Sequence, residues 1–152
     1  TTCPGSASIT KLAEVMLSRD LFSVVILDAG DGNAIGMVDQ SDLMRAFSND
    51  NYEDLTAEKV MQETIPQIPA NIPLKTAIQM MLDNNLQTYY LMHHSGGISY
   101  PAAYLSYRNV LRFLAAKDDK DLADLGTENE KKLPLAEFTK KRDVARRSVN
   151  NK

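Results

Sequence analysis

Apolar residues recur with the same helical spacing in two separate stretches of the chain. Both stretches place apolar side chains at positions i, i+3, i+4, i+7 and i+8, which is the stripe of an amphipathic helix. The members are Ile9, Leu12, Ala13, Met16 and Leu17 in the first stretch, and Leu74, Ala77, Ile78, Met81 and Leu82 in the second. The spacing predicts helices over residues 9–17 and 74–82, and the constant offset that relates Ile9 to Leu74 predicts an internal repeat.

A strand and a turn follow each predicted helix at the same offset. Residues 22–27 and 87–92 are mostly apolar, β-branched or aromatic, which is typical of strands. Glycines then mark turns at residues 29–33 and 95–97, because glycine adopts positive φ at little cost. Each half therefore reads helix, strand and turn.

A second strand and a second helix complete each half. The strands are predicted around residues 34–38 and 102–105, and the helices over residues 40–47 and 107–116. After the turn the offset between the halves is larger, since Asp42 corresponds to Asn109, and this predicts a two-residue insertion in the later hairpin. With brief opening strands at residues 1–3 and 67–68, followed by Pro4 and Pro69, the sequence predicts an α/β fold built from a duplicated β-α-β-β-α unit.

The duplication divides the chain into two units and a tail. We expect a first unit over residues 1–50, a second over residues 56–117, and a charged C-terminal tail over residues 118–152. The tail carries six acidic and one basic residue over 118–130, then eight basic and two acidic residues over 131–152. We expect it to be partly helical or disordered and to act in docking, and we do not expect nucleic-acid binding, since aromatic residues are scarce among its basic ones.

Composition narrows the class of protein. Cys3 is the single cysteine, so the chain has no intramolecular disulfide and no cysteine-based zinc site. No apolar run reaches the roughly 18 residues of a membrane span, and no secretory segment opens the chain, so we expect a cytoplasmic protein. Because the chain starts at Thr1 without methionine, we expect further sequence upstream. His93 and His94 are adjacent in a strand and point to opposite faces, so no metal site is expected there.

The repeat resembles a known family. The pattern is a Val-Met pair (Val60, Met61), a helix with a central Met-Leu pair, an apolar strand, a turn, and Gly-apolar-apolar-(Thr/Ser)-x-x-Asp opening a helix. It is similar to a tandem pair of cystathionine-β-synthase (CBS) domains, a Bateman module, over residues 1–117, without the usual opening helix of the first unit. The resemblance implies two CBS units packed as a pseudo-two-fold pair, and a homodimer formed through helix faces.

Asp39 and Asp42, in the stretch GMVDQSD, allow three interpretations. An aspartate at the N-cap with an acid three residues later is a variant capping box. An acid/base pair is the second, although no nucleophile, metal or oxyanion hole lies nearby in the sequence. In the third, the family resemblance implies that Asp42 binds the ribose hydroxyls of an adenine nucleoside. Asp39 then stands where the family has a Thr or Ser that helps to hold a phosphate, and its charge would repel one.

The second half departs from the family pattern in the opposite way. Ser106 keeps the hydroxyl, Arg108 adds a guanidinium, and Asn109 replaces the ribose-binding aspartate. We therefore expect unequal sites, with phosphate favoured in the second. The resemblance places the adenine among residues of the opening and central strands, for which ordinary packing is the alternative. These residues are Thr2, Cys3, Pro4 and Val25 in the first unit, and Gln67, Ile68, Pro69 and Tyr90 in the second.

The sequence and the resemblance together predict a regulatory module without catalytic activity or a required cofactor. It would bind AMP, ADP or ATP between its units, as in energy sensing, and pass the signal to a regulated protein or fused domain. The alternative is a dimerising scaffold whose nucleotide sites are vestigial and whose tail docks on a partner.

Overall fold

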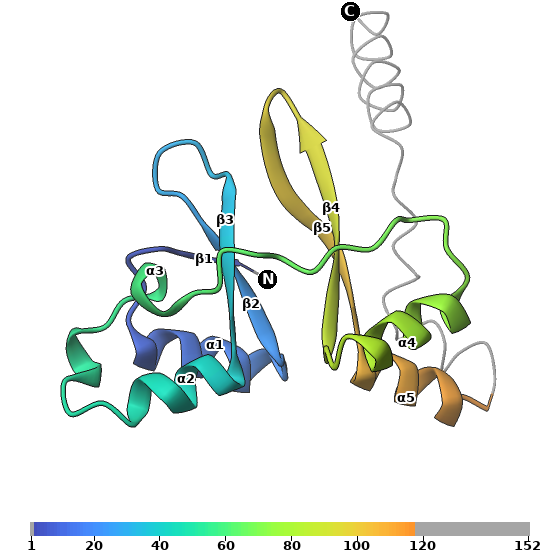
Figure 1. Ribbon diagram of the computed structural model, residues 1–152, viewed down its shortest axis with the longest axis horizontal. Helices are drawn as coiled ribbons and strands as arrows, with labels where there is room; N and C mark the ends of the chain where they lie inside the picture. Colours follow the sequence, from blue (N-terminus) through green and yellow to red (C-terminus); the bar gives the residue numbers. More distant parts are fainter. Residues whose placement is uncertain (1, 118–152) are drawn as a thin grey trace, which may run out of the picture. The chain divides into compact units, whose positions relative to one another are not determined.

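The computed structural model describes residues 2–117 (Figure 1). The chain divides into two compact units, Thr1–Tyr107 and Arg108–Lys152. The first unit contains every strand among the described residues. The predicted charged tail lies outside the described residues.

The order of elements repeats, as predicted. The first repeat consists of β1 (Thr2–Pro4), α1 (Ile9–Arg19), β2 (Ser23–Leu27), β3 (Ala34–Asp39) and α2 (Gln40–Phe47). The linker contains the 3₁₀ helix η1 (Tyr52–Asp54) and α3 (Ala57–Val60). The second repeat consists of α4 (Leu74–Asp83), β4 (Thr88–Ser95), β5 (Ile98–Ser106) and α5 (Tyr107–Ala115).

Pairing of the opening and central strands confirms the internal repeat. In the first sheet β1 runs parallel to β2, with Thr2 opposite Val25. In the second repeat Gln67 forms a parallel bridge to Tyr90. The offset that relates Ile9 to Leu74 also relates both members of the first pair to those of the second.

The hairpins confirm the larger offset after the turn. Ser23 pairs with Asp39 in the first repeat, and Thr88 pairs with Ser106 in the second. Ser23 and Thr88 are related by the earlier offset, whereas Ser106 lies two positions further along than that offset would place it. The two-residue insertion therefore lies in the β4–β5 hairpin, as predicted.

The opening strand of the second repeat is shorter than predicted. Only the single bridge at Gln67 forms there, with hydrogen bonds from the Tyr90 amide to the Pro66 carbonyl (2.8 Å) and from the Ile68 amide to the Tyr90 carbonyl (3.0 Å). Prolines flank this bridge, and Pro69 has no N–H with which to extend the ladder. The second sheet therefore consists of β4 and β5 alone.

A matching C-terminal cap ends the first helix of each repeat. Asp20 (φ 55°) and Asn85 (φ 52°), at equivalent positions of the repeat, adopt the left-handed conformation. The next residue then donates its amide back into the helix, from Leu21 to the Met16 carbonyl (2.8 Å) and from Leu86 to the Met81 carbonyl (2.9 Å). These caps fix how each chain segment leaves its helix and enters the following strand.

The main core lies between the first sheet and the helices α1 and α2, which lie side by side in Figure 1. Its fully buried side chains include Leu12, Val24, Ile26 and Val38. Ala57 of α3, also fully buried, closes this core from the linker. The first repeat thus buries a cluster to which its linker contributes.

The linker also joins the edge of β3. The amides of Met37 and Gln62 each donate to the other residue's carbonyl, at 2.9 and 2.8 Å. Gly36 allows this approach, since a Cβ built there would lie 2.5 Å from the Gln62 carbonyl oxygen. The edge of the first sheet is therefore covered where the linker crosses it.

The opposite face of the first sheet packs against the second repeat. Val25 and Met37 form a buried cluster with Tyr90 of β4. Both repeats contribute to this cluster within the first compact unit, and it borders the residues described next.

Candidate functional site

Asp39 and Asp42 form a reciprocal capping box at the start of α2. The Asp42 amide donates to Asp39 Oδ1 and the Asp39 amide donates to Asp42 Oδ2, both at 2.9 Å. This geometry satisfies two helix N–H groups that would otherwise lack partners. The structure thus confirms the capping interpretation of the pair.

The Asp42 carboxylate is directed into the protein. Asp42 is 4% exposed, and its Oδ2 also accepts a hydrogen bond from Gln62 Nε2 at 2.9 Å. The Arg45 guanidinium donates to the other oxygen, Oδ1. Both oxygens of Asp42 are therefore already engaged by groups of the protein itself.

Asp39 is more open and carries its charge without a cationic partner among the described residues. Its carboxylate is half-buried and accepts hydrogen bonds from uncharged groups, namely the Asp42 amide, Ser41 and Gln62 Nε2 at 3.1 Å. Burial acts to raise the pKa of Asp39, but these hydrogen bonds together outweigh burial and hold the pKa below its ordinary value. Asp39 is therefore a carboxylate at neutral pH.

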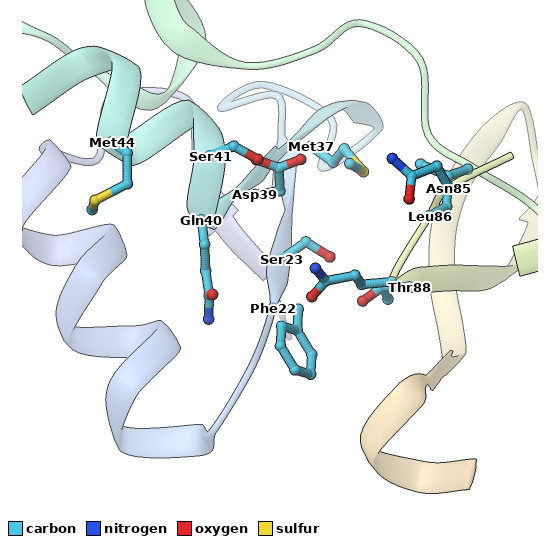
Figure 2. A pocket seen from close by; sticks show the side chains of 11 residues that line it. Phe22, Ser23, Met37, Asp39, Gln40, Ser41, Met44, Asn85, Leu86 and Thr88 are labelled. Atoms are coloured by element: carbon cyan, nitrogen blue, oxygen red, sulfur yellow. The ribbon is translucent and has the colours of Figure 1, made fainter. Parts of the chain in front are cut away.

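A pocket of about 330 Å³ opens beside Asp39 (Figure 2). It lies among the start of β2, the end of β3 and the first turns of α2 in the first repeat, and the segment before and at the start of β4 in the second. Its volume is at the lower end of the range for small-molecule sites. The lining residues are Phe22, Ser23, Met37, Asp39, Gln40, Ser41, Met44, Asn85, Leu86, Gln87 and Thr88.

Thr88 brings an unpartnered hydroxyl to this pocket. The residue is 7% exposed, and its Oγ1 has no hydrogen-bond partner among the described residues. In Figure 2 the Thr88 hydroxyl points from β4 toward the pocket. A buried hydroxyl without a partner costs free energy, so a bound polar ligand or water would stabilise it.

Ser23, next to Thr88 in the pocket lining, is held by the second repeat. Its hydroxyl shares a 2.7 Å hydrogen bond with the Tyr90 hydroxyl. Burial raises the pKa of Tyr90 to about 12, the Ser23 hydrogen bond lowers it in part, and Tyr104 raises it further. This bond links β2 to β4 beneath the pocket.

Replacing Tyr90 by phenylalanine should destabilise the protein by about 1–2 kcal/mol at pH 7, because Ser23 loses its partner. The folded pKa of about 12 exceeds the unfolded value of about 10. The neutral phenol therefore contributes stability that is complete below pH 10 and is lost as the pH rises toward 12, about 2–3 kcal/mol in all. Urea unfolding between pH 7 and 11.5 should show this loss in the parent and not in Tyr90→Phe. Exposed Tyr100→Phe is the control, and an identical alkaline loss in Tyr90→Phe would contradict the assignment.

The predicted adenine-binding residues of the first repeat lie outside this pocket. Cys3 and Val25 are buried in clusters on opposite faces of the sheet, whereas Thr2 and Pro4 are exposed. Burial raises the pKa of the Cys3 thiol. Asp39 is the one residue of the first repeat predicted to bind nucleotide that lines the pocket.

The residues of the second repeat that were predicted to bind nucleotide are dispersed as well. Ile68 and Pro69 line a separate apolar pocket of about 250 Å³ with residues of α4, β4 and β5. Gln67 forms the bridge to Tyr90. Ser106 ends β5 and is buried, and Arg108 and Asn109 lie in the first turn of α5.

Sequence reasoning missed the contribution of the second repeat, residues 85–88, to the pocket. A signal was present in Thr88, a polar residue at the start of an apolar strand, and in Asn85, which occupies the position that Asp20 occupies in the first repeat. Neither indicates which distant surface the segment contacts.

The described part of the chain contains neither a metal-binding cluster nor a helix suited to a membrane. Residues 2–117 contain no group of three or more His, Cys, Asp or Glu side chains placed to hold a metal ion. None of the helices described is long and apolar enough to cross a membrane.

The comparisons with known proteins relate the chain to CBS domains. Residues 1–49 match the CBS domain family. The comparison with curated proteins gave no match.

Solved CBS structures share the fold. A CBS-domain-containing protein from Agrobacterium tumefaciens has a TM-score of 0.63 and 18% identity, over 75% of this chain and 87% of that one. An acetoin utilization protein (AcuB, described as putative) from Vibrio cholerae has a TM-score of 0.62 and 18% identity, over 85% and 89%. The CBS domain pair of protein MJ0100, in complex with 5′-methylthioadenosine and S-adenosyl-L-methionine, has a TM-score of 0.62 and 15% identity, over 78% and 91%.

These matches agree with the internal repeat and its strand pairing. The match over residues 1–49 covers the first repeat, and the likeness to solved structures extends over both. Residues 1–49 therefore match a CBS domain, and the chain has the α/β fold of CBS-domain pair proteins.

Proposed function

We propose that the protein is a regulatory CBS pair that binds an adenine nucleoside or nucleotide in the pocket beside Asp39. The observation that carries this proposal is the pocket itself, where an ionised carboxylate and the unpartnered Thr88 hydroxyl line the same space. A carboxylate accepts two hydrogen bonds from a vicinal diol, as ribose would offer. Asp39 takes this role in the proposal in place of Asp42, because Asp39 is half-buried and lines the pocket, whereas Asp42 is 4% exposed and does not line it.

The related structure supports the choice of ligand class. The CBS pair of MJ0100 is described with two adenosine derivatives. The apolar side chains Phe22, Met37 and Leu86 offer contact area for a purine ring, and Met adapts to flat ligand surfaces. AMP, ADP and ATP, expected from the sequence, belong to the same class.

The way the pocket is built supports the regulatory role in this proposal. Both repeats line it, so a ligand that prefers one arrangement of the repeats shifts their equilibrium by its difference in affinity. Among its described lining residues there is no His, Cys or Lys to act as nucleophile or base beside Asp39. We propose that a cytoplasmic partner protein, or a domain fused to this chain, reads the change.

A thermal-shift panel tests the ligand class. Adenosine, 5′-methylthioadenosine, S-adenosylmethionine, AMP, ADP and ATP are compared, each at about 1 mM, with guanosine and inorganic phosphate as controls. We expect at least one adenine compound to raise the melting temperature by a few degrees, since saturation a hundredfold above Kd adds about 2.7 kcal/mol. No shift with any adenine compound would favour the scaffold alternative.

We also propose a homodimer that forms through helix faces. Leu17 on α1 is 83% exposed and Leu82 on α4 is 58% exposed, and the two occupy equivalent positions of the repeat. Large apolar side chains exposed at matching positions suit an interface more than the surface of a monomer.

Sedimentation of the full chain at micromolar concentration should give twice the mass of 16.9 kDa. The double variant Leu17→Glu/Leu82→Glu should sediment as a monomer, because charge is excluded from an apolar interface. Ser18→Glu, which adds charge on the adjoining face of α1, is the control. A parent chain that is monomeric throughout would refute the dimer.

A further inference from the structure

The pocket beside Asp39 carries a negative charge that no cation among the described lining residues offsets. Asp39 is the single ionisable residue among those that line it. Within the described residues Asp39 forms no ion pair, because the neighbouring Arg45 pairs with Asp42. The donors to Asp39 are amides and a hydroxyl, which stabilise its charge without cancelling it.

The amides at the start of α2 are already engaged and leave little to bind an anion. A helix N-terminus ordinarily binds phosphate through its first amides and its dipole. Here the Gln40 amide donates to the Phe22 carbonyl at 3.1 Å, and the Ser41 and Asp42 amides donate to the Asp39 carboxylate. The positive end of the helix is therefore committed to Asp39.

The groups left to meet a ligand are neutral or negative. Thr88 offers its unpartnered hydroxyl, Asp39 offers acceptor oxygens, and the side chains of Phe22, Met37 and Met44 offer apolar and thioether surface. A phosphate dianion here would face a carboxylate in a partly desolvated space, where like charges repel strongly. A ribose diol, a thioether or a cation would meet no such repulsion.

We propose that Asp39 makes this pocket selective for nucleosides whose 5′ substituent is uncharged or cationic, and that it rejects nucleotides bearing a 5′ phosphate. This inference rests on the proposed function, because it names the ligand class of the same site. Asp39 acts as a specificity determinant in two ways: it accepts the ribose hydroxyls, and its charge repels phosphate. The AMP, ADP or ATP expected from the sequence is then excluded from this pocket.

A matched series of ligands isolates the charge. Adenosine, 5′-amino-5′-deoxyadenosine and AMP share one nucleoside and differ at the 5′ position, where they are neutral, cationic and anionic at pH 7. Calorimetry on the full chain should give an affinity for AMP at least tenfold below that for adenosine, and an affinity for the amine at or above that for adenosine. Raising the salt concentration should narrow these differences, since ions screen the carboxylate.

Two variants test whether Asp39 is the cause. Asp39→Asn and Asp39→Ser both keep an N-cap acceptor and remove the charge. Each should bring the affinities for AMP and adenosine to within about threefold of each other, mainly by strengthening AMP binding. Asp50→Asn removes the same charge from an exposed residue outside the pocket lining and should leave the ratio unchanged. Thermal melts confirm that the variants fold. If a variant does not fold, the comparison of adenosine, the amine and AMP on the parent chain still tests the charge selection.

The outcomes separate the two levels of the proposal. AMP binding to the parent as tightly as adenosine, or an AMP-to-adenosine ratio unmoved in the two Asp39 variants, overturns the charge selection and leaves the nucleoside site in place. If none of the three compounds binds the parent chain, and guanosine does not bind either, the proposed function and this inference are both overturned.

Discussion

Replacing Leu12 by alanine should lower the free energy of unfolding by about 3–5 kcal/mol, which is a large share of the stability of a domain of this size. Leu12 lies on α1 with 0% exposure and packs in the cluster that includes Val24 and Ile26. Truncation removes its buried methyl groups and leaves a cavity that a sheet and two helices hold open. Urea unfolding of the parent and the variant measures the difference.

The repeat supplies a matched control for Leu12. Its equivalent in the second repeat is Ala77, which is 2% exposed and lines the apolar pocket of about 250 Å³ with Leu91 and Leu105. Ala77→Leu should therefore raise stability by about 1–2 kcal/mol, since it fills apolar space at about 0.8 kcal/mol for each methylene buried. If Ala77→Leu instead lowered stability by as much as Leu12→Ala does, the second core would be as tightly packed as the first, contrary to the structure.

Replacing Gly36 by alanine should cost about 2–3 kcal/mol, because the new Cβ would overlap the linker. This Cβ would lie 2.5 Å from the Gln62 carbonyl oxygen and 2.7 Å from the Met61 sulfur. The sulfur belongs to a flexible side chain, but the carbonyl belongs to the bridge between Met37 and Gln62, so relief requires the linker to leave the strand edge.

Hydrogen exchange locates this effect. The Gln62 amide, bonded to the Met37 carbonyl, should exchange much faster in Gly36→Ala, while the amides of α1 keep their order of protection. Ala103→Gly, the reverse change at the equivalent position of β5, is the control. This change should lower the free energy of unfolding by no more than about 1 kcal/mol, because Ala103 is exposed and the main effect is the lower preference of glycine for a strand. Unchanged protection at Gln62 would contradict the proposed clash.

Periodicity was sufficient to predict most of the fold. The stripe from Ile9 to Leu17 corresponds to α1, and the predicted correspondence between the halves appears in the pairing of Thr2 with Val25 and of Gln67 with Tyr90. The capping box at the start of α2 was also predictable, because both of its residues lie within one turn of helix. These features depend on neighbours that are close in sequence or related by the repeat.

The candidate site was less predictable because it depends on distant contacts. Gln62, 20 residues away in sequence, donates a hydrogen bond to the Asp42 carboxylate, and no local sequence pattern predicts that bond. The pocket itself forms where Thr88 and its neighbours approach Ser23 and Asp39, and the sequence specifies each strand but not which strand surfaces meet. The resemblance to CBS pairs included Asp39 among the site residues, but it assigned the ribose to Asp42 and named none of residues 85–88, and the accessibility of each carboxylate required the structure.

The bridge between Met37 and Gln62 bears on the order in which the chain folds during synthesis. Residues 1–49 match the CBS domain family, yet their sheet edge and core are finished by Ala57, Met61 and Gln62 from the linker. A nascent chain that ends at residue 49 would therefore expose an open strand edge and an uncovered core, the features that promote misassembly. The segment that completes the core and the sheet edge of the first repeat thus extends through the linker, beyond the end of the family match. A fragment intended to fold alone has to include Gln62.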